Sequence, residues 1–200
     1  MDVVHDQESN RRKDRLIASQ KSTPLYDFYY YALLPENGDK RPLEFTVTLI
    51  DDDPLFLETL KDYLTSMNVA GIETFSSGEE FLKTFKKGDR RFVVCDFDFG
   101  SSEIMDGGQV LEAIKKIDAK VPVVILSAQD KLSIALDALK KGAIDYFIKG
   151  MESTFTTVLT SILKTNEIFR LRKDRRDFAT LGGVGLVLFI TLLVLSYYYR

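Results

Sequence analysis

Several residue types are too scarce in this chain of 200 residues to build common kinds of active site. Cys95 is the one cysteine, which excludes a disulfide framework or a thiolate metal cluster within the chain. His5 is the one histidine and lies near the N-terminus, which argues against a Ser-His-Asp triad or a zinc site built from several histidines. The 27 basic and 30 acidic residues leave no basic excess, so nucleic-acid binding by bulk electrostatics is not expected.

Charge and hydrophobicity are distributed unevenly along the chain. The N-terminus has no apolar stretch typical of secretory signals, and residues 1–43 are interpreted as a polar, partly disordered arm. Residues 178–199, by contrast, contain no charged side chain, and 16 of these 22 residues are hydrophobic. A helix of that length reaches roughly 33 Å, enough for a ~30 Å hydrocarbon core. The sequence therefore predicts a transmembrane helix over 178–199, preceded by a basic juxtamembrane helix over 166–177.

Between residues 44 and 165, short apolar runs alternate with segments of helical spacing. The runs expected to form strands are Phe45–Ile50, Gly71–Phe75, Arg91–Cys95, Val121–Leu126 and Ala143–Ile148. In the segments between them, apolar residues recur three and four positions apart, as in amphipathic helices. This alternation predicts an α/β fold, a doubly wound parallel sheet of five strands with helices on both faces. Such sheets bind ligands beyond the carboxyl ends of their strands.

Charged and hydroxyl-bearing side chains stand at the carboxyl ends of four predicted strands. They are Asp51, Asp52 and Asp53 after the first strand, Asp96 after the third, Ser127 after the fourth and Lys149 after the fifth. Clustered carboxylates repel one another unless they are protonated or bind a cation, and oxygen ligands without His or Cys favour Mg²⁺ or Mn²⁺. The lysine and the serine supply a charge and a hydroxyl donor for phosphate oxygens.

At these positions the chain resembles the receiver domain of bacterial two-component response regulators. The resemblance covers about residues 44–165 and implies a flavodoxin-like receiver fold. The pieces that carry it, in this order, are Ile50-Asp51-Asp52, Val94-Cys95-Asp96, Asp106-Gly107, Leu126-Ser127-Ala128 and Asp145-Tyr146-Phe147-Ile148-Lys149. Each piece alone is a weak signal, whereas all of them in order at fitting intervals are a strong one.

The resemblance implies how the chain would bind a phosphoryl group. Asp96 is similar to the aspartate that accepts this group, and Lys149 is similar to the lysine that binds it. Ser127 takes the position of the switch hydroxyl, and Tyr146 takes that of the aromatic residue that turns inward when the hydroxyl moves. A carboxylate attacks an anionic phosphoryl group only where metal and lysine offset the charge repulsion, which supports these roles physically.

The resemblance also implies a metal site. Asp51 and Asp52 are similar to the acidic pair that holds Mg²⁺ (or Mn²⁺), with Asp96 and the backbone carbonyl of Asp98 as the remaining protein ligands. Asp53 is not expected to bind the metal, because with the proline that follows it suits the start of the next helix.

The chain departs from the family pattern at two places beside this site. Asp106-Gly107 comes about three residues later after Asp96 than is usual, so that the intervening loop, which contains Ser101-Ser102-Glu103, is longer. Gly150 follows the lysine where the family usually has a proline, which loses a rigid bend and keeps flexibility.

The basic residues beside the apolar segment predict its orientation. Arg170, Arg172, Lys173, Arg175 and Arg176 precede the segment, and only Arg200 follows it. By the positive-inside rule, the receiver domain is expected on the cytoplasmic side of a bacterial inner membrane, with a single pass through the bilayer.

Together these features predict a membrane-anchored, single-domain response regulator that acts through protein–protein contact. A sensor histidine kinase or a phosphotransfer protein is expected to supply the phosphoryl group, and an unidentified protein to receive the signal. The chain is not expected to be an enzyme beyond catalysing its own phosphorylation and dephosphorylation. Two alternatives stay open, a phosphate sink and a non-phosphorylated adaptor in a membrane complex, while a Mg²⁺-dependent phosphatase would need an acid/base motif that the sequence lacks.

Overall fold

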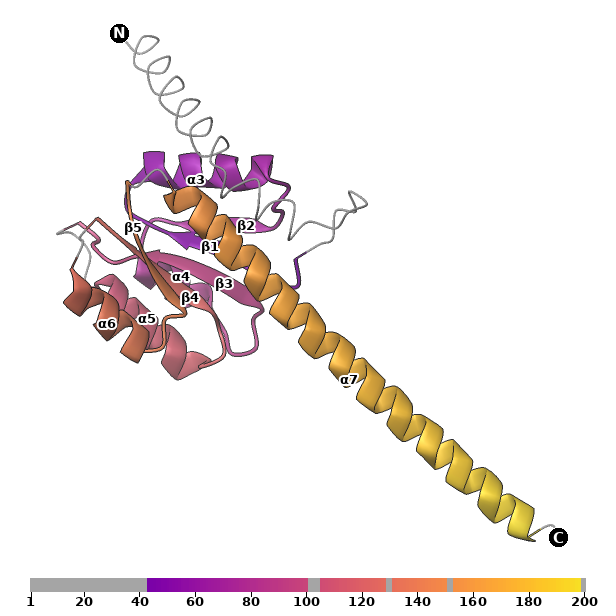
Figure 1. Ribbon diagram of the computed structural model, residues 1–200. Coiled ribbons are helices and arrows are strands. Elements are labelled where there is room, and N and C mark those ends of the chain that lie inside the picture. The colour runs from indigo at the N-terminus through magenta and orange to yellow at the C-terminus, as the bar shows by residue number, and fades with distance from the viewer. Residues whose placement is uncertain (1–42, 101–104, 129–130, 151–152, 199–200) are drawn as a thin grey trace. The chain divides into compact units, whose positions relative to one another are not determined.

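The structure is a computed structural model that describes residues 43–100, 105–128, 131–150 and 153–198 (Figure 1). The polar arm expected over residues 1–43 lies outside this range, apart from Leu43. The chain forms two compact units, of which the first ends at Lys164 and the second begins at Thr165. The whole sheet belongs to the first unit.

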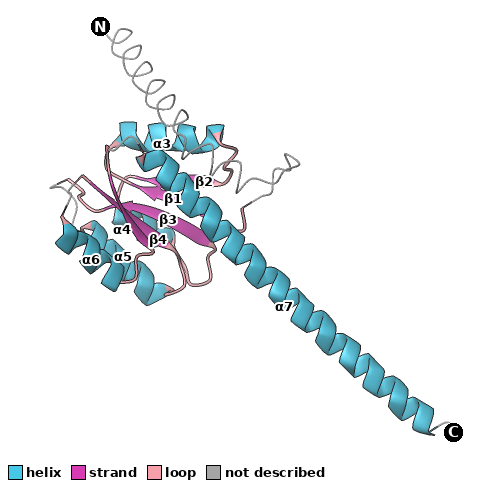
Figure 2. Ribbon diagram, viewed as in Figure 1, coloured by secondary structure: helices cyan, strands magenta, loops and turns pink. Residues whose placement is uncertain are grey.

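Strands and helices alternate along the described part of the chain as the sequence predicts (Figure 2). The elements are β1 (Thr46–Ile50), α3 (Pro54–Ser66), β2 (Ile72–Phe75), α4 (Gly78–Thr84), β3 (Arg91–Asp96), α5 (Gly107–Ile117), β4 (Val123–Ser127), α6 (Leu132–Lys140), β5 (Asp145–Ile148) and α7 (Thr154–Tyr198). All five predicted strands are confirmed, and their bounds differ from the prediction by at most a few residues. β4, for example, begins after Pro122 rather than at Val121, because proline has no N–H to donate to a neighbouring strand.

The five strands form one parallel sheet in the order β2-β1-β3-β4-β5. The register pairs Ile50 at the end of β1 with Cys95 of β3, so the residues that follow them, Asp51 and Asp96, lie at the same edge. The predicted doubly wound α/β fold is therefore confirmed. Because all the strands are parallel, the carboxyl ends of β1, β3, β4 and β5 meet at this one edge.

Alternate strand residues supply the two layers of the core. On one face, strand residues pack with α4, α5 and α6 in a buried cluster that includes Ile50, Val93, Cys95, Ile125, Phe81, Val110, Leu111 and Ile114. The other face carries buried Leu49, Val94 and Leu126, and the helices α3 and α7 contribute the buried residues Leu60, Tyr63, Leu64, Phe155, Val158 and Ile162. Helices on both faces leave the carboxyl edge of the sheet as the place for polar side chains.

The last helix, α7, runs without interruption from Thr154 to Tyr198. Among the described residues, no helix combines the length and the apolar character needed to cross a membrane. The transmembrane helix expected over 178–199 stays a prediction from the sequence.

Candidate functional site

The carboxyl edge of the sheet brings together the acidic side chains that the sequence singles out. One carboxylate oxygen from each of Asp51, Asp52 and Asp96 lies within 4.8 Å of the other two. Asp51 and Asp96 are buried, with relative exposures of 2% and 3%, whereas Asp52 is exposed. The predicted convergence of these residues is confirmed.

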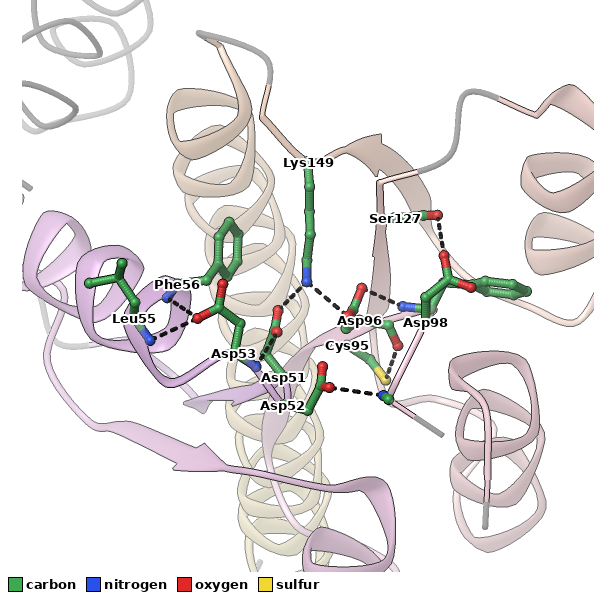
Figure 3. A network of polar contacts seen from close by, with 12 residues as sticks. Asp51, Asp52, Asp53, Leu55, Phe56, Cys95, Asp96, Asp98, Ser127 and Lys149 are labelled. Atoms are coloured by element: carbon green, nitrogen blue, oxygen red, sulfur yellow. Dashed lines mark hydrogen bonds and ion pairs between the residues drawn. The ribbon is translucent and has the colours of Figure 1, made fainter. Parts of the chain in front are cut away.

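Lys149 joins the acidic group from the end of β5. Its Nζ lies 2.6 Å from Asp51 Oδ2 and 2.8 Å from Asp96 Oδ2, so one ammonium group forms ion pairs with both buried carboxylates (Figure 3). The backbone N–H of Lys149 donates to the carbonyl of Ser127 at 2.7 Å, which extends the pairing of β5 with β4 to the site itself. The sheet thereby fixes the point from which the lysine side chain reaches the carboxylates.

Burial at this edge changes the acidity of the two buried aspartates. Burial raises the pKa of Asp96 from 3.8 to about 6, although the hydrogen bond from Lys149 acts in the opposite direction. Burial likewise raises the pKa of Asp51 above 3.8. The pKa of Lys149 is lowered by burial, but its ion pairs with the two carboxylates outweigh this effect and raise it overall. The lysine therefore stays charged, and the site favours a further cation that would allow all the carboxylates to ionise.

Asp53 belongs to the helix that follows β1 rather than to this group. Its side chain accepts hydrogen bonds from the backbone N–H groups of Leu55 and Phe56, at 2.9 and 3.2 Å. This is the N-cap geometry of α3, with Pro54 in the first turn, as the sequence predicts. The backbone N–H of Asp53 also donates to Asp51 Oδ1 at 3.0 Å, which helps to orient the neighbouring carboxylate.

Two glycines tie the loop after β3 to the site, and the sequence analysis assigned neither of them this part. The backbone N–H of Gly100 donates to Asp52 Oδ2 at 2.8 Å. Gly107 opens α5 directly against the end of β3, and its N–H donates to the carbonyl of Phe97 at 2.9 Å. Asp106 caps α5 in a capping box with Gln109, so the helix begins in a regular way despite the late position of Asp106-Gly107.

Ser127 is fully buried at the end of β4, and its hydroxyl donates to Asp98 Oδ2 at 3.3 Å. Asp98 thus contacts Ser127 through its side chain, and its backbone also forms a hydrogen bond with the Asp96 carboxyl group. The predicted role of its backbone carbonyl as a metal ligand stays a prediction. Tyr146 lies on β5, is partly buried and packs against the core cluster on the α4–α6 side. The switch roles of Ser127 and Tyr146 likewise stay predictions.

Cys95 lies inside β3 immediately before Asp96. Its side chain is fully buried, and burial raises the pKa of the thiol well above its ordinary value. The thiol donates to the carbonyl of Asp96 at 3.2 Å. It therefore belongs to the core, as expected for a buried, unreactive cysteine.

The donor set fits a hard divalent cation. Carboxylate oxygens are the ligands that Mg²⁺ prefers, and Asp52 is exposed, so a hydrated ion would reach the site from solvent. The raised pKa values of Asp51 and Asp96 mark buried negative charge that Lys149 alone does not offset. Asp51, Asp52 and Asp96 would hold such an ion, and Lys149 lies on the side of the two buried carboxylates.

The comparison with protein families agrees with this geometry. Residues 47–159, more than half of the chain, match the model of the response regulator receiver domain. The chain belongs to this family. Receiver domains are phosphorylated on an aspartate, bind Mg²⁺ at their acidic pocket, and interact with histidine kinases or phosphotransfer proteins.

Individual relatives match over the receiver domain only. The chain is 36% identical over 108 residues to the probable C4-dicarboxylate response regulator DctR of Bacillus subtilis, and this match covers 53% of this chain and 46% of DctR. It is 27% identical over 119 residues to the chemotaxis protein CheY of the same species, and this match covers 60% of this chain and 95% of CheY. The chain spans about half the length, or less, of the first curated relatives that it matches.

Solved structures give the same fold. The CheX–CheY–BeF₃–Mg²⁺ complex from Borrelia burgdorferi contains a chain that is 26% identical, with a TM-score of 0.54 over 62% of this chain and 90% of that one. The BeF₃-activated receiver domain of DrrB has a TM-score of 0.53 at 22% identity, over 62% of this chain and 97% of that one. At 22% identity, the similarity to the DrrB receiver domain concerns the fold alone.

Proposed function

We propose that this receiver domain accepts a phosphoryl group on Asp96 from a histidine kinase or a phosphotransfer protein, and that it signals through contact with another protein. One observation carries the proposal: the ammonium group of Lys149 forms ion pairs with both buried carboxylates, those of Asp51 and Asp96. A buried nucleophilic carboxylate, a cation and further carboxylates for a metal ion are the groups that phosphoryl transfer to aspartate requires.

In the proposed reaction, an oxygen of the Asp96 carboxylate attacks the phosphorus of the donor. A new P–O bond forms as the P–N bond of phosphohistidine breaks, and the leaving nitrogen keeps the electron pair. When bound, a divalent cation held by Asp51, Asp52 and Asp96 would offset negative charge on the carboxylates and the phosphoryl oxygens. Lys149 would then exchange its ion pair with Asp96 for a phosphoryl oxygen, and Ser127 would donate its hydroxyl proton to another.

Exposed apolar residues support an output through protein contact. Leu132 on α6 has a relative exposure of 74%, and Leu136 and Leu139 on the same helix are also exposed. Ile144, directly before β5, the strand that carries Tyr146, is also exposed. A phosphorylation-dependent partner on this surface would distinguish a regulator from a phosphate sink.

We also propose that residues 178–199 anchor the chain in the bacterial cytoplasmic membrane, with the receiver domain in the cytoplasm. The support is the sequence itself, in which 22 residues carry no charge and five basic residues lie between Arg170 and Arg176. This placement would give Asp96 access to a kinase that uses cytoplasmic ATP.

Acetyl phosphate tests the proposed phosphorylation without the cognate kinase. The purified full chain with Mg²⁺ and acetyl phosphate is expected to gain one acid-stable, base-labile phosphoryl group, detected by mass spectrometry of the intact protein. Asp96→Asn should abolish the labelling, whereas Asp53→Asn, which keeps a capping side chain two residues from Asp51, should label normally. Undiminished labelling of Asp96→Asn would place the acceptor elsewhere, and an unlabelled wild-type chain would favour the adaptor function.

A further inference from the structure

The aromatic ring of Phe56 lies beside the ammonium group of Lys149. Lys149 Nζ is 4.7 Å from the centroid of the ring, within the ~6 Å over which a cation is attracted to an aromatic face (Figure 3). The lysine side chain is only 16% exposed, so water screens this attraction less than at an open surface. Phe56 comes from the first turn of α3, three residues after the aspartate that caps this helix.

Other rings hold Phe56 in place from behind. Phe155, in the first turn of α7, meets Phe56 edge to face, with ring centroids 5.6 Å apart and planes inclined by 75°. Tyr63 packs against Phe155 at 5.5 Å, and both side chains are buried, at 0% and 3% exposure for Tyr63 and Phe155. The ring beside the lysine, which is itself partly buried, therefore packs against other aromatic side chains that are buried.

We propose that Phe56 is a positioning residue for Lys149, whose π face holds the ammonium group at the point where it serves phosphorylation of Asp96. This inference rests on the proposed function, since it concerns the rate at which Asp96 accepts a phosphoryl group. Phe56 is not among the residues that carry the resemblance to receiver domains, and the sequence analysis did not single it out.

The physical argument starts from the lysine side chain. Lysine has a flexible four-carbon stem and a strongly hydrated charge, so its ammonium group needs partners to stay in one position. Asp51 and Asp96 bind it from the side of the sheet, and the ring of Phe56 attracts it from the side of α3. An aliphatic side chain of similar size would fill the same space without this attraction, because it lacks the negative face of the ring.

The ring also suits a lysine that has to change partners. In the proposed reaction, Nζ leaves Asp96 Oδ2 and binds a phosphoryl oxygen on the same side of the site. A π face has no single acceptor atom, so the ammonium group can shift by a fraction of its own size while it stays in contact with the ring. Charge stabilisation of the transferring phosphoryl group depends on such placement, and small displacements slow the reaction.

Three replacements of Phe56 in the full chain separate ring electronics from packing. Phe56→Leu removes the π face, and Phe56→Tyr keeps it. A trifluorinated phenylalanine keeps the shape of the ring, but its fluorine atoms withdraw electron density and so remove the negative charge of the π face. Phe45→Leu is the matched control, because Phe45 also stacks on another ring, that of Phe92 at 5.7 Å, but precedes β1 at the opposite end of the strand. For each variant, the initial rate of phosphorylation by acetyl phosphate at saturating Mg²⁺ and the affinity for Mg²⁺ are measured.

The expected result is a loss of about fivefold in the initial phosphorylation rate for Phe56→Leu and for the fluorinated ring. This is the change in rate that corresponds to the free energy of one cation–π contact. Phe56→Tyr and Phe45→Leu should stay within about twofold of the wild type, and Mg²⁺ affinity should change in none of them. A structural role alone would not make the fluorinated ring behave like leucine.

The outcomes that overturn the inference differ from those that overturn the proposed function. A labelled wild type with equal rates for Phe56→Leu or the fluorinated variant rejects the positioning role and leaves the acceptor role of Asp96 intact. An equal loss for Phe45→Leu rejects it as well, because the loss then follows from general packing. A wild-type chain that takes up no phosphoryl group overturns the proposed function and, with it, the positioning role.

Discussion

Gly107 lies so close to the backbone at the end of β3 that a side chain does not fit there. A Cβ atom at this position would lie 2.6 Å from the Cα of Phe97, and it would also collide with the carbonyl oxygen of Asp96. The helix α5 therefore starts directly on the peptide group that follows the candidate acceptor. This contact packs the start of α5 against the backbone at the end of β3.

Gly107→Ala is expected to destabilise the receiver domain by about 3 kcal/mol, because two backbone segments would have to move apart. Urea unfolding followed by circular dichroism measures this loss. Gly150→Ala is the matched control, since a Cβ atom there meets nothing within 4 Å and only the positive φ of +81° opposes it. Its cost should be about 1–2 kcal/mol, and equal losses for the two variants would contradict the close packing at Gly107.

Metal titration separates two adjacent aspartates. Asp52→Ala should weaken Mg²⁺ binding by about tenfold or more, since its carboxylate belongs to the group of three that converges at the site. Asp53→Ala should leave the affinity within about twofold, because its side chain caps α3. It should instead lower the free energy of unfolding by about 1 kcal/mol. Equal losses of affinity would show that the register of the acidic run has been assigned wrongly.

The raised pKa of Asp96 predicts a pH-dependent cost to stability in the absence of divalent metal. Between pH 3.8 and about 6 the native carboxyl group keeps a proton that the unfolded chain has released, so stability falls as the pH rises through this window. Asp96→Asn removes this cost. At about pH 8 the variant should be more stable than the wild type by about 1–3 kcal/mol, and near pH 4 the difference should vanish.

Asp118→Asn provides a control of opposite sign for the pH experiment. Hydrogen bonds from the backbone of Lys120 and Gly88 lower the pKa of Asp118, so its carboxylate contributes stability above its unfolded pKa. This variant should lose stability at neutral pH and match the wild type in strong acid. A difference between Asp96→Asn and the wild type that does not vary with pH would argue against ionisation of Asp96 as its cause.

Thiol labelling in intact cells tests the proposed anchor and its orientation. On a Cys95→Ser background, one variant carries a cysteine appended after Arg200 and another carries Lys87→Cys, which is exposed in the receiver domain. An impermeant reagent should label the appended cysteine and spare the one at position 87, because the basic residues before 178–199 favour the cytoplasmic side. The reverse pattern would invert the topology, and release of the chain by a carbonate wash would exclude a membrane span.

The sheet and the convergence of Asp51, Asp52 and Asp96 at its edge could be predicted from the sequence, because they depend on local patterns. The alternation of apolar runs and amphipathic segments indicates the parallel sheet, and parallel strands necessarily bring the residues after β1 and β3 to one edge. The N-cap role of Asp53 follows from its position before a proline at the start of a helix, and the structure confirms it.

The contacts that depend on packing distances could not be predicted. Phe56 has no local signal that distinguishes it from any other apolar residue in the first turn of an amphipathic helix. Its position beside Lys149 depends on how α3, β5 and α7 pack together. The same holds for the hydrogen bond from Gly100 to Asp52, which depends on the path of a loop with no periodic pattern.

The two glycines of the loop after β3 also explain why this loop can be longer than is usual in the family. Gly100 is bound to Asp52 before the undescribed residues 101–104, and Gly107 is packed on Asp96 after them. Extra residues between two such fixed points add only a small entropic cost, because the cost of closing a loop grows slowly with its length. An insertion between Ser101 and Ser102 is therefore expected to leave the distances among Asp51, Asp96 and Lys149 unchanged.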